Sequence, residues 1–379
     1  MGAPLEGVLV LDLSRVLAGP FCTMLLGDLG ARVIKIEHPV EGDVTRGWSP
    51  PVEPSSGLSA YFLSINRNKE SIALDLSSAG GRKSVEILAG RADVLVENFA
   101  PGGLEKLGLS LPALRQANPR LVTASITACG SEGPAARQPG FDLLAQAGAG
   151  LMAVTGEPGG EPTKVGVAAS DLFAGCFAAV GILAALAARE RTGQGTHVET
   201  DLFSATLGAL VNVAEAALVT GKEASRFGNA HAQIVPYRTF SAEDGAFVLA
   251  VGTDPQFARL SDALGRPEWK EDPAYRTNAA RVVHRRRLEG ELEAIFGRRP
   301  RAEWLGLLAR ASLPVGPVRG PLEALESDTA RALGLLVEAR GVRFVGSPIR
   351  VASHTTPLRF PPQLDEHGAS LRKEFGLPA

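Results

Sequence analysis

The sequence is poor in the residues by which many classes of protein are recognised. Its 379 residues include only three cysteines, three tryptophans and three tyrosines, and its formal net charge is −2. Cys22, Cys129 and Cys176 lie far apart, so they match neither a disulfide framework nor a metal-ligand pattern, and we expect buried free thiols in a reducing cytoplasm. The small net charge argues against nucleic acid or an anionic membrane as the main partner.

Several motifs of nucleotide-binding and metal enzymes are also missing. The chain contains no Walker loop, HExxH motif, EF-hand loop or GxSxG motif. Glu37 follows the first predicted loop at about the distance of a ribose-binding acid, but that loop reads SRVLAGPFCT and lacks the glycines of a dinucleotide-binding turn. The N-terminus has no basic segment before a long apolar run, so we expect no signal peptide. Neither a nicotinamide cofactor nor a bound metal is expected.

What the sequence does contain is a regular alternation of strand and helix patterns. Strand-like Val8–Leu13 and Arg32–Glu37 flank a helical stretch from Pro20 to Leu29. The alternation continues with strands at 71–76, 93–97, 121–127 and 197–200 and with helices at 80–89, 111–117, 142–153, 171–189 and 203–220. This pattern predicts an α/β fold with a doubly wound parallel sheet. The apolar run from Leu172 to Ala188 is just under the length of a membrane span and predicts a buried core helix.

The composition changes near Ser225, which predicts a second domain. Two strand-like stretches, 237–241 and 246–251, flank a turn and predict a hairpin, and helical patterns follow at 255–264, 279–296 and 302–311. We therefore expect a large domain at 1–220, completed by 325–379, and a smaller α+β domain at 225–320. The strand-like stretch 341–351 is expected to return to the first sheet.

Asp171 is the main candidate for a catalytic group. Ser170 has the features of an N-cap, which would place Asp171 in the first helical turn, where free N–H groups and the helix dipole favour an anion. The residues around it, from 168 to 176, are mostly small or apolar. A poorly solvated carboxylate held by amides can act as a nucleophile. The alternative from spacing alone is an ordinary first-turn acid. Among the histidines, His231 in the loop GNAHAQIVPY is either a surface residue or part of a site.

The whole chain resembles the class III CoA-transferases, a family that includes formyl-CoA, crotonobetainyl-CoA and benzylsuccinyl-CoA transferases and the related α-methylacyl-CoA racemases. The resemblance runs in order over nearly the full length. The stretches that carry it are GVLVLDLSRVLAGPFCTMLLGDLGARVIKIEHP, NRNKESIALDL, ADVLVENFAPGGLEKLGL, GFDLLAQAGAGLMAVTG, AASDLFAG, EWKEDPAYRTNAAR and LPVGPV.

The resemblance implies a Rossmann-like large domain with a parallel sheet, a smaller α+β domain, and ring-shaped subunits interlocked as a cytoplasmic homodimer. It implies acyl-CoA and a carboxylic acid as substrates, with no tightly bound cofactor. It places the catalytic carboxylate at Asp171, which would attack the thioester to form a mixed anhydride and then an aspartyl-CoA thioester, from which the acceptor acid takes CoA. Reversible exchange of this kind requires that water be kept from the anhydride.

The residues that the resemblance assigns to CoA fall on two loops and a strand end. They are Arg15, Ala18, His38, Leu74, Asn98, Phe99 and Lys106. His38 stands where the family often has arginine. Leu17 replaces the polar residue typical of the formyl and oxalyl enzymes, and their glycine-rich loop is replaced by the loop of His231, so an oxalate specificity is not expected.

The racemases of the family carry a histidine where this chain has Phe141, which cannot transfer a proton. This departure favours a transferase over a racemase, although Asp142 beside it could replace the missing base. Leu17, Phe141, Asp142 and His231 are the tentative substrate-pocket residues. A catalytically silent CoA-binding protein of the same fold is the further alternative.

Overall fold

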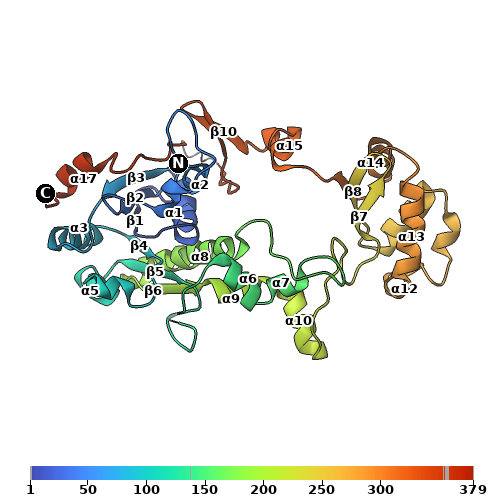
Figure 1. The fold of residues 1–379 in the computed structure, drawn as a ribbon, viewed down its shortest axis with the longest axis horizontal. Helices are drawn as coiled ribbons and strands as arrows, with labels where there is room; N and C mark the ends of the chain where they lie inside the picture. The colour runs from blue at the N-terminus through green and yellow to red at the C-terminus, as the bar shows by residue number, and fades with distance from the viewer. Residues whose placement is uncertain (1, 137, 353, 355–357, 379) are drawn as a thin grey trace. The chain divides into compact units, whose positions relative to one another are not determined.

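The computed structural model describes residues 2–136, 138–352, 354 and 358–378, which divide into two compact units. The first unit comprises residues 1–152, 164–224 and 327–379, and the second comprises 153–163 and 225–326. Figure 1 shows the course of the chain through both. Each unit has a hydrophobic core of its own, so each is described by itself.

The first unit is built on a six-stranded, all-parallel sheet of order β3-β2-β1-β4-β5-β6. The strands are β1 (Leu9–Asp12), β2 (Arg32–Glu37), β3 (Lys69–Ala73), β4 (Val94–Glu97), β5 (Val122–Thr127) and β6 (His197–Asp201). The predicted alternation is therefore confirmed. The order reverses between β1 and β4, and in open parallel sheets ligands bind at the carboxyl ends of the strands beside such a reversal.

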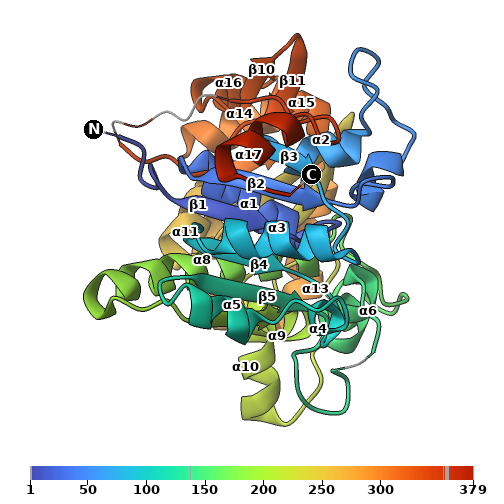
Figure 2. The ribbon, with the colours of Figure 1, turned by 90° about the vertical axis from the view of Figure 1, so that its left-hand side faces the viewer.

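Helices cover both faces of this sheet (Figure 2). Along β5, Val122, Ala124 and Ile126 join the core with α1 (Ala18–Asp28), α8 (Ala169–Thr192) and α9 (Leu202–Ala209). The opposite core contains α3 (Ala79–Ala89), α4 (Gly103–Lys106), α5 (Leu111–Ala117) and α17 (Gly368–Phe375). Because both faces are covered, the central strands β1 and β4 are nearly continuous apolar runs, whereas the edge strands β3 and β6 contain several polar residues. The shorter elements nearby are η1 (Val44–Gly47), α2 (Ala60–Ile65) and α16 (Asp328–Ala332).

Three of the predicted helices are divided, and one of them lies in the second unit, where the stretch 279–296 forms α12 (Asn278–Val283) and α13 (Arg285–Phe296). The stretch 142–153 forms α6 (Asp142–Gly148) and α7 (Leu151–Val154), separated by Gly150 with a φ of +89°. The stretch 203–220 forms α9 and α10 (Val211–Thr220), which are bent by 76°. The break falls at Val211, which has a φ of +43° outside the right-handed helical region. Continuous apolar composition gave no sign of either break.

The predicted cap of α8 is wrong. Ala168 stands at the N-cap, and Ser170 lies inside the helix, where its hydroxyl accepts a hydrogen bond from Thr206 Oγ1 at 2.7 Å. The backbone N–H of Ser170 is instead capped from another helix, by Asp142 Oδ1 at 2.8 Å. A capping carboxylate supplied by tertiary structure removes the need for a local one.

The expected buried core helix α8 is buried only in part in the chain taken alone. Only 39% of its most apolar stretch is buried, and Phe177 and Val180 are 48% and 63% exposed. Cys176 is exposed as well, and Cys129 is partly so, whereas Cys22 is buried as expected. In the described part of the chain, α8 has the length and composition of a membrane span, as does the bent pair α9–α10 taken together.

The second unit contains a three-stranded antiparallel sheet. Its strands are β7 (Tyr237–Ala242), β8 (Gly245–Ala250) and β9 (Val315–Pro317), and β7 and β8 confirm the predicted hairpin. Its helices are α11 (Asp254–Ala263), η2 (Pro267–Lys270), α12 (Asn278–Val283), α13 (Arg285–Phe296), α14 (Arg301–Arg310) and α15 (Pro321–Leu325). Aromatic side chains of Phe240, Phe247, Phe296 and Trp304 meet edge-on in its core.

The stretch 341–351 does not return to the first sheet. It contains β11 (Val342–Val345), which pairs with β10 (Leu336–Ala339) as a separate antiparallel hairpin. The free edge of the large sheet is occupied instead by the turn before α17, where Asp365 accepts from the N–H of Ala73 and the N–H of His367 donates to Ser71 O. The backbone groups of the edge strand are thereby satisfied without another strand.

Candidate active site

Asp171 lies in the first turn of α8 and lines a pocket of about 290 Å³ in the first unit. The walls come from the carboxyl ends of three neighbouring strands and the segments that follow them: Val16 and Ala18 after β1, residues 98–101 after β4, and residues 126–128 at the end of β5. Ala136, the segment 138–141 and Leu202 complete the lining. The pocket therefore lies at the carboxyl edge of the sheet beside the reversal in strand order.

The Asp171 carboxyl group is half-buried and has few polar partners. Burial raises its pKa to about 7, the neighbouring Asp142 carboxylate adds to the rise, and a hydrogen bond from the backbone N–H of Ala18 opposes it. At neutral pH the group is therefore divided between its acid and carboxylate forms. A carboxylate that loses hydration in this way is a better nucleophile than one in water.

Asp142 supports the helix that carries Asp171. Its Oδ1 accepts from the N–H of Ser170, and its Oδ2 accepts from Gln146 Nε2 at 2.6 Å. Gln146 is fully buried, and its Oε1 accepts from the N–H of Val165 at 2.8 Å. Asp142 and Gln146 therefore hold the chain that enters α8. Sequence reasoning missed Gln146, although its spacing of four residues from Asp142 places both side chains on one face of a helix.

A second pocket, of about 140 Å³, contains four of the residues assigned to CoA. Arg15, His38, Leu74 and Phe99 line it. The Arg15 guanidinium lies 4.7 Å from the centre of the Phe99 ring, a cation–π distance. Phe99 also lines the pocket of Asp171, so one side chain belongs to both spaces.

The other predicted residues have different surroundings. Lys106 is exposed on α4 and does not line either pocket. His38 lines the second pocket, but its Nδ1 is engaged within the protein, where it accepts hydrogen bonds from the N–H groups of Val40 and Glu41. Leu17 is 8% exposed and also does not line either pocket. Phe141 lies at the rim of the Asp171 pocket with 64% of its surface exposed.

Asn98 and His231 make contacts within the protein. The Asn98 side chain accepts from the N–H of Arg15 at 2.8 Å and donates to the Arg15 carbonyl at 2.7 Å. It therefore fixes the loop after β1, in addition to lining the pocket of Asp171. His231 belongs to the second unit, where its Nδ1 accepts from the N–H of Gln233 and its ring packs on Tyr237.

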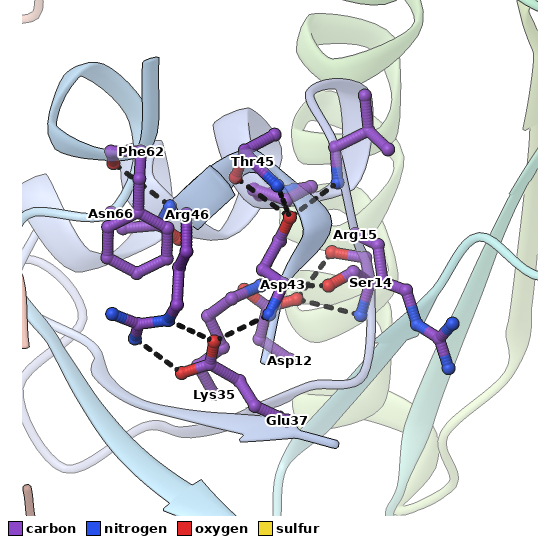
Figure 3. Close-up of polar contacts among 12 residues, drawn as sticks. Asp12, Ser14, Arg15, Lys35, Glu37, Asp43, Thr45, Arg46, Phe62 and Asn66 are labelled. Carbon is purple, nitrogen blue, oxygen red and sulfur yellow. Dashed lines mark hydrogen bonds and ion pairs between the residues drawn. The ribbon is translucent and has the colours of Figure 1, made fainter. Parts of the chain in front are cut away.

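A buried group of charged side chains lies beneath the loop after β1 (Figure 3). It consists of three acids and three bases: Asp12, Glu37, Asp43, Lys35, Arg46 and Lys69. Lys69 pairs with Asp12 and Lys35 with Asp43, both at 2.9 Å, and Arg46 pairs with Glu37 at 2.7 Å.

Sequence reasoning missed this charge group. The feature of the sequence that could have revealed it is the presence of Asp12 and Lys35 inside otherwise apolar strands. Burial would raise the pKa of Asp12, but Lys69, Lys35 and the Ser14 hydroxyl hold it well below its usual range. Burial lowers the pKa of Lys69 to about 8 against the pull of Asp12. Because each charge has a partner, the group can be buried without an uncompensated ion.

No group of three or more histidine, cysteine or acidic side chains is arranged to hold a metal ion within residues 2–136, 138–352, 354 and 358–378.

Comparison with known proteins places this geometry in a family. Residues 5–368 match the description of CoA-transferase family III. The acetyl-CoA:oxalate CoA-transferase of Acetobacter aceti is 42% identical over 99% of this chain and 96% of its own length. The succinyl-CoA:glutarate CoA-transferase of Mus musculus is 41% identical over 98% of this chain and 86% of its own. The crystal structure of a CAIB/BAIF family protein from Brucella suis superimposes with a TM-score of 0.90 at 42% identity, covering 99% of this chain and all of that one.

The chain belongs to CoA-transferase family III, and the resemblance inferred from the sequence is confirmed. It is an enzyme of the class III CoA-transferases. Leu17, one of the two departures that argued against an oxalate specificity, is buried and does not line the Asp171 pocket.

Proposed function

We propose that the protein transfers CoA from an acyl-CoA donor to a carboxylic acid through covalent intermediates on Asp171. The observation that carries the proposal is the half-buried carboxyl group of Asp171, which has a pKa of about 7 and lines a pocket that shares Phe99 with a second, arginine-bearing pocket. The strand order, with its reversal beside both pockets, supports the description of the first unit as a Rossmann-like CoA-binding domain.

In the first half of the reaction, an Asp171 oxygen attacks the acyl carbonyl carbon and the carbon–sulfur bond breaks. The products are an acyl-aspartyl anhydride and the CoA thiolate. The thiolate then attacks the aspartyl carbonyl carbon, the donor acid leaves as a carboxylate, and Asp171 carries CoA as a thioester. The pocket lining is largely apolar, which limits the water that could hydrolyse the anhydride.

In the second half, the acceptor carboxylate attacks the aspartyl thioester, which releases the thiolate and forms a second anhydride. The thiolate attacks the acceptor's carbonyl carbon, giving the new acyl-CoA and restoring the Asp171 carboxylate. The N–H of Ala18 donates toward Asp171 and is placed to stabilise its oxygen when negative charge develops there.

The nucleotide end of CoA is assigned to the pocket of Arg15, His38, Leu74 and Phe99. Arg15 supplies positive charge for a phosphate, and the pantetheine arm passes Phe99 to reach Asp171. Lys106 is exposed on α4 and could approach a phosphate from solvent.

The acceptor is proposed to be a short dicarboxylic acid. The relatives are named for oxalate, glutarate and mesaconate, with acetyl-CoA or succinyl-CoA as donors. Each donor incubated with each acid, followed by mass spectrometry of the CoA products, tests this assignment. A monocarboxylic acceptor that reacts faster than all three acids would contradict it.

The active form is proposed to be an interlocked homodimer of ring-shaped subunits in the cytoplasm. The support is the exposed apolar surface of α8 and α10 in the single chain, on which Phe177, Val180, Val211, Leu218 and Val219 are 48–79% exposed. Large apolar side chains exposed in numbers on a helix are typical of a surface that binds another protein chain. Sedimentation of the purified protein tests the dimer.

The racemase alternative is less well supported by the geometry. Phe141 cannot carry a proton, and both carboxylate oxygens of Asp142 accept hydrogen bonds that hold α8. A racemase would exchange the substrate's α-proton with deuterated water in the absence of an acceptor acid, whereas a transferase would not.

The experiment that tests the nucleophile is Asp171→Ala. The variant should lose turnover and the hydroxylamine-sensitive CoA adduct while still binding CoA, because the second pocket is unchanged. Persistent turnover would refute the assignment. A wild-type protein that binds CoA but forms neither product nor adduct would indicate the silent binding protein.

A further inference from the structure

Gly175 lies one turn after Asp171 in α8, in close contact with the first turn of α1, where the loop that follows β1 ends. A Cβ atom at this position would lie 2.6 Å from the Ala18 carbonyl oxygen and 3.1 Å from Phe21 Cδ1. The first distance is far below a normal contact, and the atom is part of the backbone, so a rotamer change cannot relieve it. The absence of a side chain at Gly175 is what permits this approach.

The loop cannot easily move away, because it is held on its other sides. Asn98 binds both the N–H and the carbonyl of Arg15. Val16 has a φ of +69°, an unfavourable conformation for a β-branched residue, and its N–H lies 3.4 Å from Asp43 Oδ1. Asp43 is itself fixed by Lys35 and Thr45 in the buried charge group (Figure 3). A β-branched residue persists in such a conformation only where its surroundings enforce it.

We propose that Gly175 is a positioning residue: by having no side chain, it lets α8 approach the loop until the N–H of Ala18 reaches the Asp171 carboxylate. The inference rests on the proposed function, in which Asp171 is the nucleophile. The contact has two consequences for that reaction. It favours the ionised form of Asp171 in surroundings that otherwise disfavour it, and it fixes the direction of the attacking oxygen.

The test is Gly175→Ala with Gly181→Ala as the matched control. Both residues lie in α8 and both changes add one methyl group, but a Cβ at Gly181 would meet the side chain of Val198 at 2.6 Å rather than the loop. Both variants also gain the same helix propensity. Effects on folding and helix packing are therefore shared, and an effect on Asp171 is specific to Gly175.

For Gly175→Ala we expect kcat to fall by about 10- to 100-fold, the KM for acyl-CoA to stay within about twofold, and the midpoint of the rise of kcat/KM with pH to move upward. Gly181→Ala should keep the wild-type midpoint. Equal midpoints in the two variants, or a Gly175→Ala defect confined to KM, would overturn the inference.

Two further variants cover the remaining cases. Phe21→Leu combined with Gly175→Ala relieves the contact with Phe21 but not that with Ala18. Recovery of kcat in this double variant would therefore also overturn the inference.

If Gly175→Ala does not fold, Asn98→Ala releases the same loop from its other side and should raise the pH midpoint of kcat/KM. An unchanged midpoint counts against the inference. Failure of the proposed function itself would be distinguished by a wild-type protein that lacks transferase activity.

Discussion

Asp12 in β1 and Asp171 in the first turn of α8 are two aspartates of the first unit whose surroundings shift their pKa values in opposite directions. Asp12 is fully buried, yet Lys69, Lys35 and Ser14 hold its pKa well below the usual range. Asp171 is less buried, but it has one amide donor and a neighbouring carboxylate, and its pKa rises to about 7. The comparison teaches that the number and charge of the partners, rather than the depth of burial, decide whether a carboxylate is a structural ion or a reactive group.

The largest effect on stability is expected when a partner is removed from the paired aspartate. Lys69→Met removes the ion-pair partner of the buried Asp12 carboxylate and should lower the free energy of unfolding by about 3–5 kcal/mol. Chemical denaturation at pH 7 measures it. Lys83→Met is the control, since Lys83 pairs with Glu86 on the surface and its loss should cost at most about 1 kcal/mol. Equal losses in both variants would mean that the charge group does not stabilise the fold.

Removing the charge of Asp171 should raise the free energy of unfolding rather than lower it. Because the folded-state pKa of Asp171 lies above its unfolded value, the charged form weakens the fold fully above about pH 7 and not at all below about pH 4. Asp171→Asn should therefore raise the free energy of unfolding at pH 8 by on the order of 2 kcal/mol, a value reduced for the partial access of water.

This gain should shrink as the pH falls from 7 to about 4. Urea denaturation at pH 8 and at pH 4.5 measures the difference. Asp328→Asn, which removes an exposed carboxylate, should show no such dependence. A gain of equal size at both pH values would show that the Asp171 carboxylate is not strained by burial.

The smallest effect concerns the pH dependence of the reaction. Only the ionised form of Asp171 can attack the thioester, so kcat/KM should rise with pH to a midpoint near 7. Asp142→Asn removes the neighbouring negative charge and keeps a side-chain oxygen for the N–H of Ser170, so it should move the midpoint to lower pH. A rise of the midpoint would contradict the proposed coupling of the two carboxylates.

The sequence was sufficient for the elements whose pattern is local. The strands of the large sheet are short apolar runs between turn residues, and all six were predicted, although β3 begins at Lys69 rather than at 71. It was not sufficient for helix breaks at Gly150 and Val211, where backbone conformation rather than composition ends the helix. It also placed Ser170 at the cap of α8, because a carboxylate supplied from Asp142 leaves no mark near residue 170.

The residues of the candidate site also divide into those that the sequence predicted and those that it did not. Its apolar neighbours made Asp171 a candidate, and family resemblance assigned it the catalytic role. The same resemblance selected Arg15, His38, Leu74 and Phe99, which the fold brings to one pocket. Neither the Asn98 bonds to Arg15 nor the close contact of Gly175 with Ala18 could be predicted, since both join segments more than eighty residues apart.

The sequence by itself determined the order of strands and helices, the family and the residue types available for chemistry. Local hydrophobic patterns and capping preferences act over a few residues and can be recognised in the linear sequence. Only the tertiary structure decided which aspartate is held as a paired ion and which is left with little solvation. That outcome depends on distances of a few ångströms between chain segments, at which charge and desolvation set the energy of a carboxylate.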